Sequence, residues 1–206
     1  MIVNADSAQV YADLRILSAR PDPEDTELAE HRLFGHRDGG QACSAASWAE
    51  EAREVIADVH GRGQLPILVG GTGLYLRALL DGIAPIPPVH PPVRAEVRAA
   101  RAGHNHRRLA VLDPVAAARL HPNDSQRVAR ALEVVLSSGR TLASWQARTV
   151  GGMRDEVGLF GVRLEPKRAS LDPVIDQRFS DMIAQGGMRE VERLIARDLC
   201  RRTGGN

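Results

Sequence analysis

Two stretches of the sequence hold residues whose types and spacing could do chemistry. In the first, the apolar run Pro66–Val69 ends at Gly70-Gly71-Thr72-Gly73, and apolar residues then recur at helical spacing. A strand that enters a helix through glycines lets the backbone approach a ligand, and the helix start offers free N–H groups. The turn therefore predicts a ligand-binding joint of an α/β sheet, with a purely structural turn as the alternative.

The second stretch runs from His121 to Glu133. Arg127 and Arg130 lie three residues apart and share one face near the start of a predicted helix, beside Gln126. Guanidinium and amide groups on one face suit phosphates and base edges. The alternative is an Arg130–Glu133 pair within the helix, with Arg127 in solvent.

Charge is distributed unevenly along the chain. Residues 94–154 hold eleven arginines against four acidic residues, although the formal net charge of the whole chain is +1. Such a block predicts a face that meets a polyanion, or else an ordinary solvated helical face. Aromatic residues make up 3% of the chain, too few for an open platform that stacks single-stranded bases.

Composition limits the class of protein. With 206 residues, 43% hydrophobic and 26% charged, the chain is typical of a soluble globular protein, and no apolar run is long enough to span a membrane. Cys43 and Cys200 lack the spacing of a disulfide framework or a zinc site. We therefore expect a cytoplasmic protein. Lys167 is the only lysine, which excludes a Gly-Lys-Ser/Thr phosphate loop within these residues.

The first part of the chain has an α/β pattern. Met1–Asn4 is strand-like, so Asp6 follows a strand end, where it could be reactive or merely cap a turn. We expect residues 15–46 to form a surface loop. A helix should begin with a capping box of Ser47 and Glu50 and bury an apolar stripe that includes Trp48.

A proline-rich segment, residues 84–92, begins a different substructure. It precedes helical patterns over Pro92–Ala102, after the Asp113-Pro114 cap, and from Asp124 or Ser125 to Gly139. We therefore predict an α/β core made of residues 1–82 and 153–206, and an all-helical insertion of residues 83–152.

The chain returns to α/β character after the insertion. Gly158–Leu164 alternates as a strand would. A helix from Ser170 that contains Arg178 should break at Gly186-Gly187. Both ends of the sequence stop within incomplete elements, so we expect it to be part of a longer chain.

Three segments together resemble the tRNA dimethylallyltransferase (isopentenyltransferase) family. They are Asp6–Tyr11, Leu68–Tyr75 and His121–Glu133, in the same order and at similar spacing. The resemblance runs from Met1 to about Ala196. It implies a P-loop-kinase-like parallel sheet with a helical insertion that grips the tRNA anticodon stem-loop. It also implies transfer of a dimethylallyl group from dimethylallyl diphosphate to the exocyclic amine of the adenosine next to the anticodon.

The resemblance also implies roles for individual residues. Asp6 would be the general base, and Thr72 would lie beside the reacting adenosine. Arg178 would bind the diphosphate. The residues expected to contact tRNA are Asp6, Ser7, Ala8, Gln9, Thr72, Arg94, Gln126, Arg127, Val128, Ala129 and Arg130.

The sequence also departs from the family pattern. The family begins with a strand and a phosphate loop ending in Gly-Lys-Thr, which would complete an Mg²⁺ clamp, and neither occurs here. A second family arginine, four residues before Arg178, is Val174. The family implies Mg²⁺ as cofactor, but we expect no metal ligand in this chain. Because the phosphate loop is missing, we expect little transferase activity from these residues alone. We also expect a monomer. The alternatives are a catalytically inactive tRNA-binding remnant and a prenyltransferase for free adenine nucleotides, which would have little need of the helical insertion.

Overall fold

The computed structural model describes residues 1–198, apart from the side chain of Ala102. The chain divides into two compact units. The sheet unit comprises residues 1–80 and those from 153 onward, and the helical unit comprises residues 81–152. The predicted division lay at 82/83 and 152/153.

The sheet unit is built on three short parallel strands, β1 (Ile2–Asn4), β2 (His31–Arg32) and β3 (Ile67–Val69), in the order β2-β1-β3. Ile2 pairs with His31 on one side and with Ile67 on the other. The expectation of an α/β fold with a parallel sheet is confirmed. Because parallel strands end at the same edge, the loops after β1 and β3 meet there.

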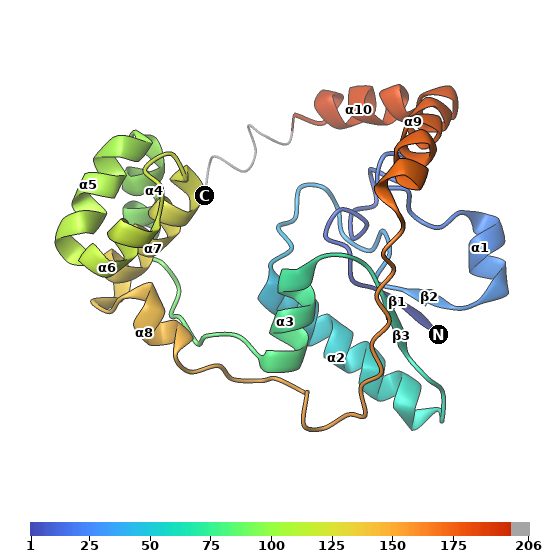
Figure 1. The fold of residues 1–206 in the computed structure, drawn as a ribbon, viewed down its shortest axis with the longest axis horizontal. Coiled ribbons are helices and arrows are strands. Elements are labelled where there is room, and N and C mark those ends of the chain that lie inside the picture. The colour runs from blue at the N-terminus through green and yellow to red at the C-terminus, as the bar shows by residue number, and fades with distance from the viewer. Residues whose placement is uncertain (199–206) are drawn as a thin grey trace. The chain divides into compact units, whose positions relative to one another are not determined.

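Helices α2 (Ala45–Gly61) and α3 (Gly73–Asp81) supply most of the core of the sheet unit (Figure 1). Trp48 is fully buried, stacks on Tyr75 with ring centroids 4.6 Å apart, and donates from Nε1 to the Asn4 carbonyl at 3.0 Å. Burial raises the pKa of Tyr75, and a hydrogen bond to the Cys43 Sγ raises it further, so this phenol stays neutral.

The predicted start of α2 was wrong by three residues. Ser44 is the N-cap, and its side chain exchanges capping-box hydrogen bonds with Ser47. Ser47 therefore occupies the third helical position, where we expected Glu50. Serine can take either place in a capping box, so the sequence signal was ambiguous in register.

Two other expectations for the sheet unit were wrong. Residues 15–46 are not wholly irregular, because they contain α1 (Pro23–Leu28), capped by Asp22, as well as β2. Conversely, Gly158–Leu164 forms no strand. Its apolar side chains are exposed, Phe160 by 89% and Val162 by 73%. Alternation alone does not make a strand, since backbone N–H and C=O groups must also pair with a neighbour.

The helical unit contains α4 (Pro91–Ala99), α5 (Ala102–Leu112), α6 (Pro114–Arg119), α7 (Ser125–Ser138) and α8 (Leu142–Gln146). The Asp113 cap before Pro114 and the end of α7 at Gly139 are as predicted, Gly139 is left-handed, and Asp124 rather than Ser125 is the N-cap of α7. The single helix expected over Pro92–Ala102 ends instead at Ala99. Asn105 Nδ2 donates to the Val97 carbonyl at 2.7 Å, which satisfies one acceptor at that helix end.

The chain returns to the sheet unit and ends, among the described residues, with α9 (Arg168–Ala184) and α10 (Gly187–Ala196), separated at Gly186 as predicted. Gly187 packs against Leu17 and the Met182 carbonyl, so the turn between the helices lies on the loop that follows β1.

The two tryptophans allow a buried and a partly exposed indole to be compared, since Trp48 lies in the core of the sheet unit and Trp145 lies in the helical unit. Trp48→Phe removes the hydrogen bond from the indole to the carbonyl of the buried Asn4 and leaves a void. We therefore expect a loss of about 2–3 kcal/mol in the free energy of unfolding. Trp145→Phe removes a bond to the Ser138 hydroxyl, which water can replace, and should cost less than about 1 kcal/mol.

Urea unfolding followed by circular dichroism measures both changes. Each variant also keeps one tryptophan, whose fluorescence reports the unfolding of a single unit. Equal losses from the two substitutions would contradict this view of the core.

Candidate active site

The two loops that follow β1 and β3 are joined by hydrogen bonds. The Ser7 N–H donates to the Thr72 hydroxyl at 2.9 Å, and that hydroxyl donates to the Ser7 Oγ at 3.3 Å. The Thr72 N–H also donates to the Ala5 carbonyl at 3.2 Å. Two predicted site segments, Asp6–Gln9 and Thr72, are therefore brought together. The Thr72 hydroxyl holds the Ser7 loop, in addition to any contact with a substrate.

Gly70 makes this close approach possible. A Cβ added there would overlap the carbonyl group of Ala5 and crowd the backbone nitrogen of Asp6. A Cβ at the neighbouring Gly71 would meet nothing within 4 Å. The first glycine of the pair is therefore required by packing between the two loops.

The Asp6 carboxylate is held through one oxygen. Oδ1 accepts from the Ala8 N–H at 2.8 Å and from the Gln9 N–H at 3.4 Å. Among residues 1–198, Oδ2 has no hydrogen-bond partner, and the side chain is half-buried. The arrangement fixes the direction of the carboxylate and leaves one oxygen able to accept a proton.

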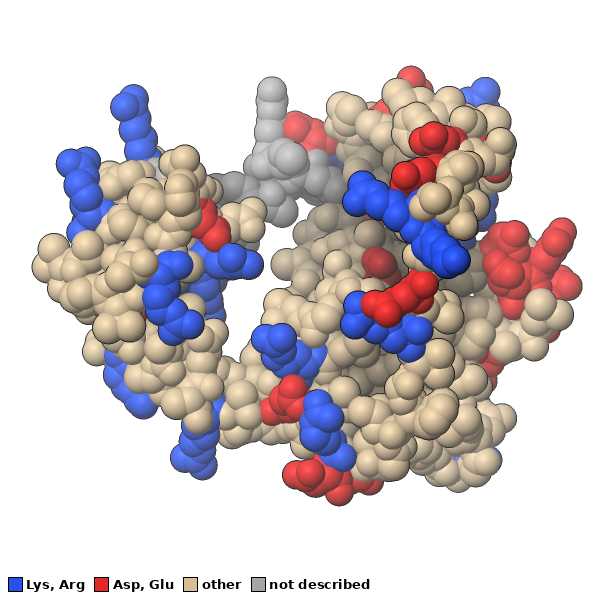
Figure 2. All heavy atoms as spheres, viewed as in Figure 1, with Lys and Arg blue, Asp and Glu red and all other residues tan. Residues whose placement is uncertain are grey.

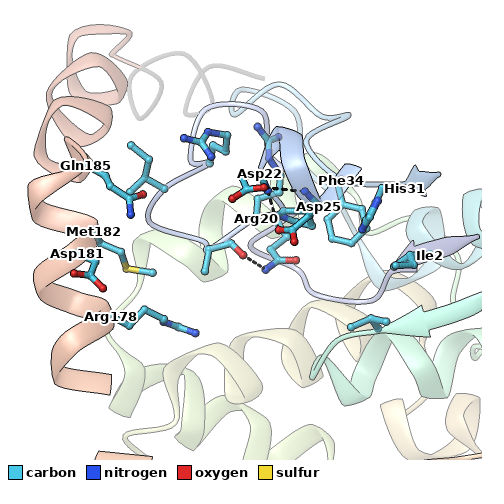
Figure 3. Close-up of a pocket in the computed structure, with 16 residues that line it drawn as sticks. Ile2, Arg20, Asp22, Asp25, His31, Phe34, Arg178, Asp181, Met182 and Gln185 are labelled. Carbon is cyan, nitrogen blue, oxygen red and sulfur yellow. Dashed lines mark hydrogen bonds between the residues drawn. The ribbon is translucent and has the colours of Figure 1, made fainter. Parts of the chain in front are cut away.

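Gln9 connects this loop to a cavity of about 470 Å³. Its Nε2 donates to the Ser18 and Ala19 carbonyls, at 2.9 and 3.0 Å, and its side chain forms part of the cavity wall. Arg178 reaches into the same cavity from α9 (Figure 3). Two predicted site residues from distant parts of the sequence thus line one cavity.

The opposite wall comes from the Arg15–Asp22 segment. The buried carboxylate of Glu190 in α10 accepts from the Ile16 N–H at 2.9 Å and from the Leu17 N–H at 3.1 Å. Arg20 packs against Gly35 and donates to the Tyr11 carbonyl at 3.3 Å. Burial lowers the pKa of the Arg20 guanidinium, the charge of Arg15 lowers it further, and Glu190 acts in the opposite direction. Arginine nevertheless remains protonated at neutral pH.

The predicted tRNA contacts of the helical unit need one correction. Gln126 and Arg127 are exposed and Arg130 is half-buried, whereas Val128 is fully buried and Ala129 is 7% exposed. The last two side chains pack in the core of the helical unit. They are therefore unavailable to RNA in this conformation, because one face of an amphipathic helix must cover that core.

The alternative Arg130–Glu133 pair is also wrong. Glu133 is fully buried and accepts from Arg98 Nε at 2.8 Å, while Arg127 pairs with its cap residue Asp124 at 3.2 Å. Among residues 1–198, Arg130 has no carboxylate within 4 Å.

Most arginines of the helical unit are not neutralised locally. Three of them pair with carboxylates within the described part of the chain: Arg98, Arg108 and Arg127. Seven others have no such partner there: Arg94, Arg101, Arg107, Arg119, Arg130, Arg140 and Arg148. Figure 2 shows arginine or lysine side chains standing out from this unit with few acidic ones between them. The unit can therefore attract a polyanion.

The described residues do not form a protein-held metal cage. Over residues 1–198, no three His, Cys, Asp or Glu side chains cluster in a way that could hold a metal ion. The side chains present thus do not fit the expected Mg²⁺ on their own.

No helix in the same range is long and apolar enough to cross a membrane.

The sequence did not predict a role for Arg15 and Arg20 of the opposite cavity wall, or for Glu190, which holds the segment between them. Residues 15–46 were read as a surface loop, and the contact between Glu190 and Ile16 joins positions 174 residues apart. The available signal was only the pair of arginines, in a segment that also carries several acidic residues.

Comparisons with known proteins show what this chain resembles. A family model described as IPP transferase matches residues 9–204. The tRNA dimethylallyltransferase of Sphingopyxis alaskensis is 56% identical over 198 residues, which are 96% of this chain and 65% of that protein. This chain thus spans about two thirds of that relative's length.

Solved structures show the same fold. The full-length tRNA isopentenylpyrophosphate transferase of Bacillus halodurans superimposes with a TM-score of 0.56 and is 28% identical, covering 96% of this chain and 62% of that one. A eukaryotic dimethylallyltransferase acting on tRNA superimposes with a TM-score of 0.74 at 24% identity, covering 95% of this chain and 49% of its own.

The two adjacent glycines provide a matched test of the loop junction. Gly70→Ala should lower the free energy of unfolding by about 1–3 kcal/mol, because the new methyl group collides with the Ala5 backbone. Gly71→Ala should change it by no more than about 0.5 kcal/mol. Thermal unfolding of the two variants measures the difference. Similar midpoints would show that the loops can separate without cost.

Proposed function

The chain belongs to the IPP transferase family, and from this premise we propose that it transfers a dimethylallyl group from dimethylallyl diphosphate to an adenosine of tRNA. The observation that carries the proposal is the pairing of Asp6, with one open carboxylate oxygen, and an arginine-lined cavity that shares Gln9 with the same loop. One part can accept a proton, and the other can bind a diphosphate.

In the proposed reaction the exocyclic amine nitrogen of adenosine attacks the first carbon of the dimethylallyl group. The new C–N bond forms as the C–O bond to the diphosphate breaks, and the diphosphate leaves with that electron pair. Asp6 Oδ2 takes the proton that the amine loses. A weak base suffices, because the proton becomes acidic only as the bond forms. Arg178 stabilises the charge of the leaving diphosphate.

We further propose that the helical unit binds the anticodon stem-loop, and that the target is the adenosine next to the anticodon. The side chains proposed to contact it are Arg94, Gln126, Arg127 and Arg130. All of them except the half-buried Arg130 are exposed, and the excess of arginine in the unit also supports this proposal. The base must leave its stack to expose its amine. In the sheet unit, Asp6 to Gln9 and Thr72 are proposed to contact that base.

Three further expectations remain proposals. Mg²⁺ would take most of its ligands from diphosphate oxygens and water, as this ion often does, and we assign no step of the reaction to it. A monomeric state and a cytoplasmic location are the other two.

The general base is tested in the cell, with the protein at the length its own gene specifies. Asp6→Asn at the chromosomal locus should lower the rate of adenosine prenylation roughly 10²- to 10⁴-fold, because asparagine cannot take the proton. The amount of prenylated adenosine in tRNA should fall as a result. Its side-chain oxygen can still accept from Ala8 and Gln9, so the loop should keep its shape. Mass spectrometry of tRNA nucleosides measures the product.

Asp176→Asn, an exposed change in α9, serves as the matched control and should leave the modification intact. Full modification in the Asp6→Asn strain, at equal protein abundance, would sink the proposed role of Asp6. If the protein binds tRNA and the wild-type strain makes no prenylated adenosine, the inactive tRNA-binding alternative is favoured.

The RNA surface is tested with the purified protein and an anticodon stem-loop RNA. Arg130→Gln should weaken binding about 5- to 30-fold and reduce the slope of log K against log salt by roughly 0.7–1, the change expected for one lost phosphate contact. Arg108→Gln removes the same charge from an arginine that Glu96 already neutralises at 2.7 Å, and should change binding less than about twofold. Equal effects of the two variants would indicate attraction by net charge alone.

A further inference from the structure

Two arginines of the cavity wall have no assigned role. Arg15 and Arg20 are both half-buried and line the cavity that Arg178 enters from α9. Among residues 1–198, neither has a carboxylate within 4 Å, although Arg20 donates one hydrogen bond to the Tyr11 carbonyl. Burial and the charge of Arg15 lower the pKa of Arg20 and the charge of Glu190 raises it, so the two arginines repel each other across a partly dry cavity, which an added anion would relieve.

The acidic residues of the same cavity do not serve as that anion. Asp22 and Asp25 are exposed, and each carboxylate accepts a hydrogen bond from the other's backbone N–H in the capping box of α1. Asp181 is exposed as well and accepts from Gln177 Nε2 at 2.9 Å. These carboxylates face water and have local partners, whereas the two guanidinium groups are half-buried and, among residues 1–198, form no ion pair, although the charge of Glu190 acts on Arg20.

The segment that carries the arginines is fixed in place. The two carboxylate oxygens of Glu190 bind the Ile16 and Leu17 N–H groups, and Gln9 binds the Ser18 and Ala19 carbonyls. Arg197 also pairs with Asp13 and Asp38 nearby. A positively charged wall that is held this firmly needs little rearrangement to receive an anion.

We propose that Arg15 and Arg20 bind the diphosphate of the allylic donor from the side of the cavity facing Arg178. This inference rests on the proposed function and adds two residues to it. Three guanidinium groups around about 470 Å³ suit an anion with two phosphate groups better than one with a single phosphate, because each planar group can donate two parallel hydrogen bonds. Glu190 is a positioning residue in this scheme, since it holds the segment without facing the ligand.

Isothermal titration calorimetry with inorganic diphosphate, dimethylallyl diphosphate and inorganic phosphate tests this proposal on the purified protein. Wild type should bind both diphosphates more tightly than phosphate. Arg15→Gln and Arg20→Gln should each weaken diphosphate binding roughly 10- to 100-fold, the loss expected for a charge-assisted hydrogen bond. Arg168→Gln, in the same chain but 93% exposed in its side chain, is the control and should bind like wild type.

Arg20 also has structural contacts, so Arg20→Lys is included to keep the charge. It should bind more tightly than Arg20→Gln at a similar unfolding midpoint. Wild type that does not bind diphosphate, or Arg15→Gln and Arg20→Gln variants that bind it as wild type does, would overturn the proposal.

The outcome is separable from that of the proposed function. Arginine-dependent diphosphate binding in a protein whose strain makes no prenylated adenosine would leave this site standing and remove the transferase. Prenylated tRNA in the strain, with diphosphate binding indifferent to both arginines, would remove this site alone.

Discussion

The constraint on which the site depends is the contact between the backbone after β1 and the backbone after β3. Parallel pairing brings both strand ends to one edge of the sheet, and the absence of a side chain at Gly70 lets the Ala5 carbonyl come close enough to accept from the Thr72 N–H. The Ser7–Thr72 hydrogen bonds follow from that approach. Without it, Asp6 and Thr72 would belong to two independent loops.

Local signals in the sequence predicted local structure well. The Asp113-Pro114 cap and the left-handed Gly139 were placed correctly, because each depends on backbone groups within four residues. The gathering of Asp6 and Thr72 was also predictable, since both follow parallel strands. The register of the α2 cap was not, because Ser44 and Ser47 are both serines with similar capping ability.

Long-range partners explain the remaining failures. Nothing near Ile16 in sequence indicates that the buried Glu190 holds its N–H, so the segment that carries Arg15 and Arg20 was predicted to be surface loop. In Gly158–Leu164 the strand pattern was present but a pairing partner is absent from the described structure. In α7, a motif of five consecutive residues cannot all face a ligand, because a helix turns two of them, Val128 and Ala129, into its core.

Gln9 links the Asp6 loop to the segment that carries Arg15 and Arg20. Its backbone N–H binds the Asp6 carboxylate, while its side-chain amide binds the Ser18 and Ala19 carbonyls of the segment that carries Arg15 and Arg20. Four consecutive residues therefore set the position of Asp6, the proposed proton acceptor, relative to the wall that carries Arg15 and Arg20. In the proposed allylic displacement, the nucleophile enters and the diphosphate leaves at the same carbon, so the base and the diphosphate-binding wall must be held at a fixed separation. A short loop bonded at both ends provides that separation without requiring a conformational change.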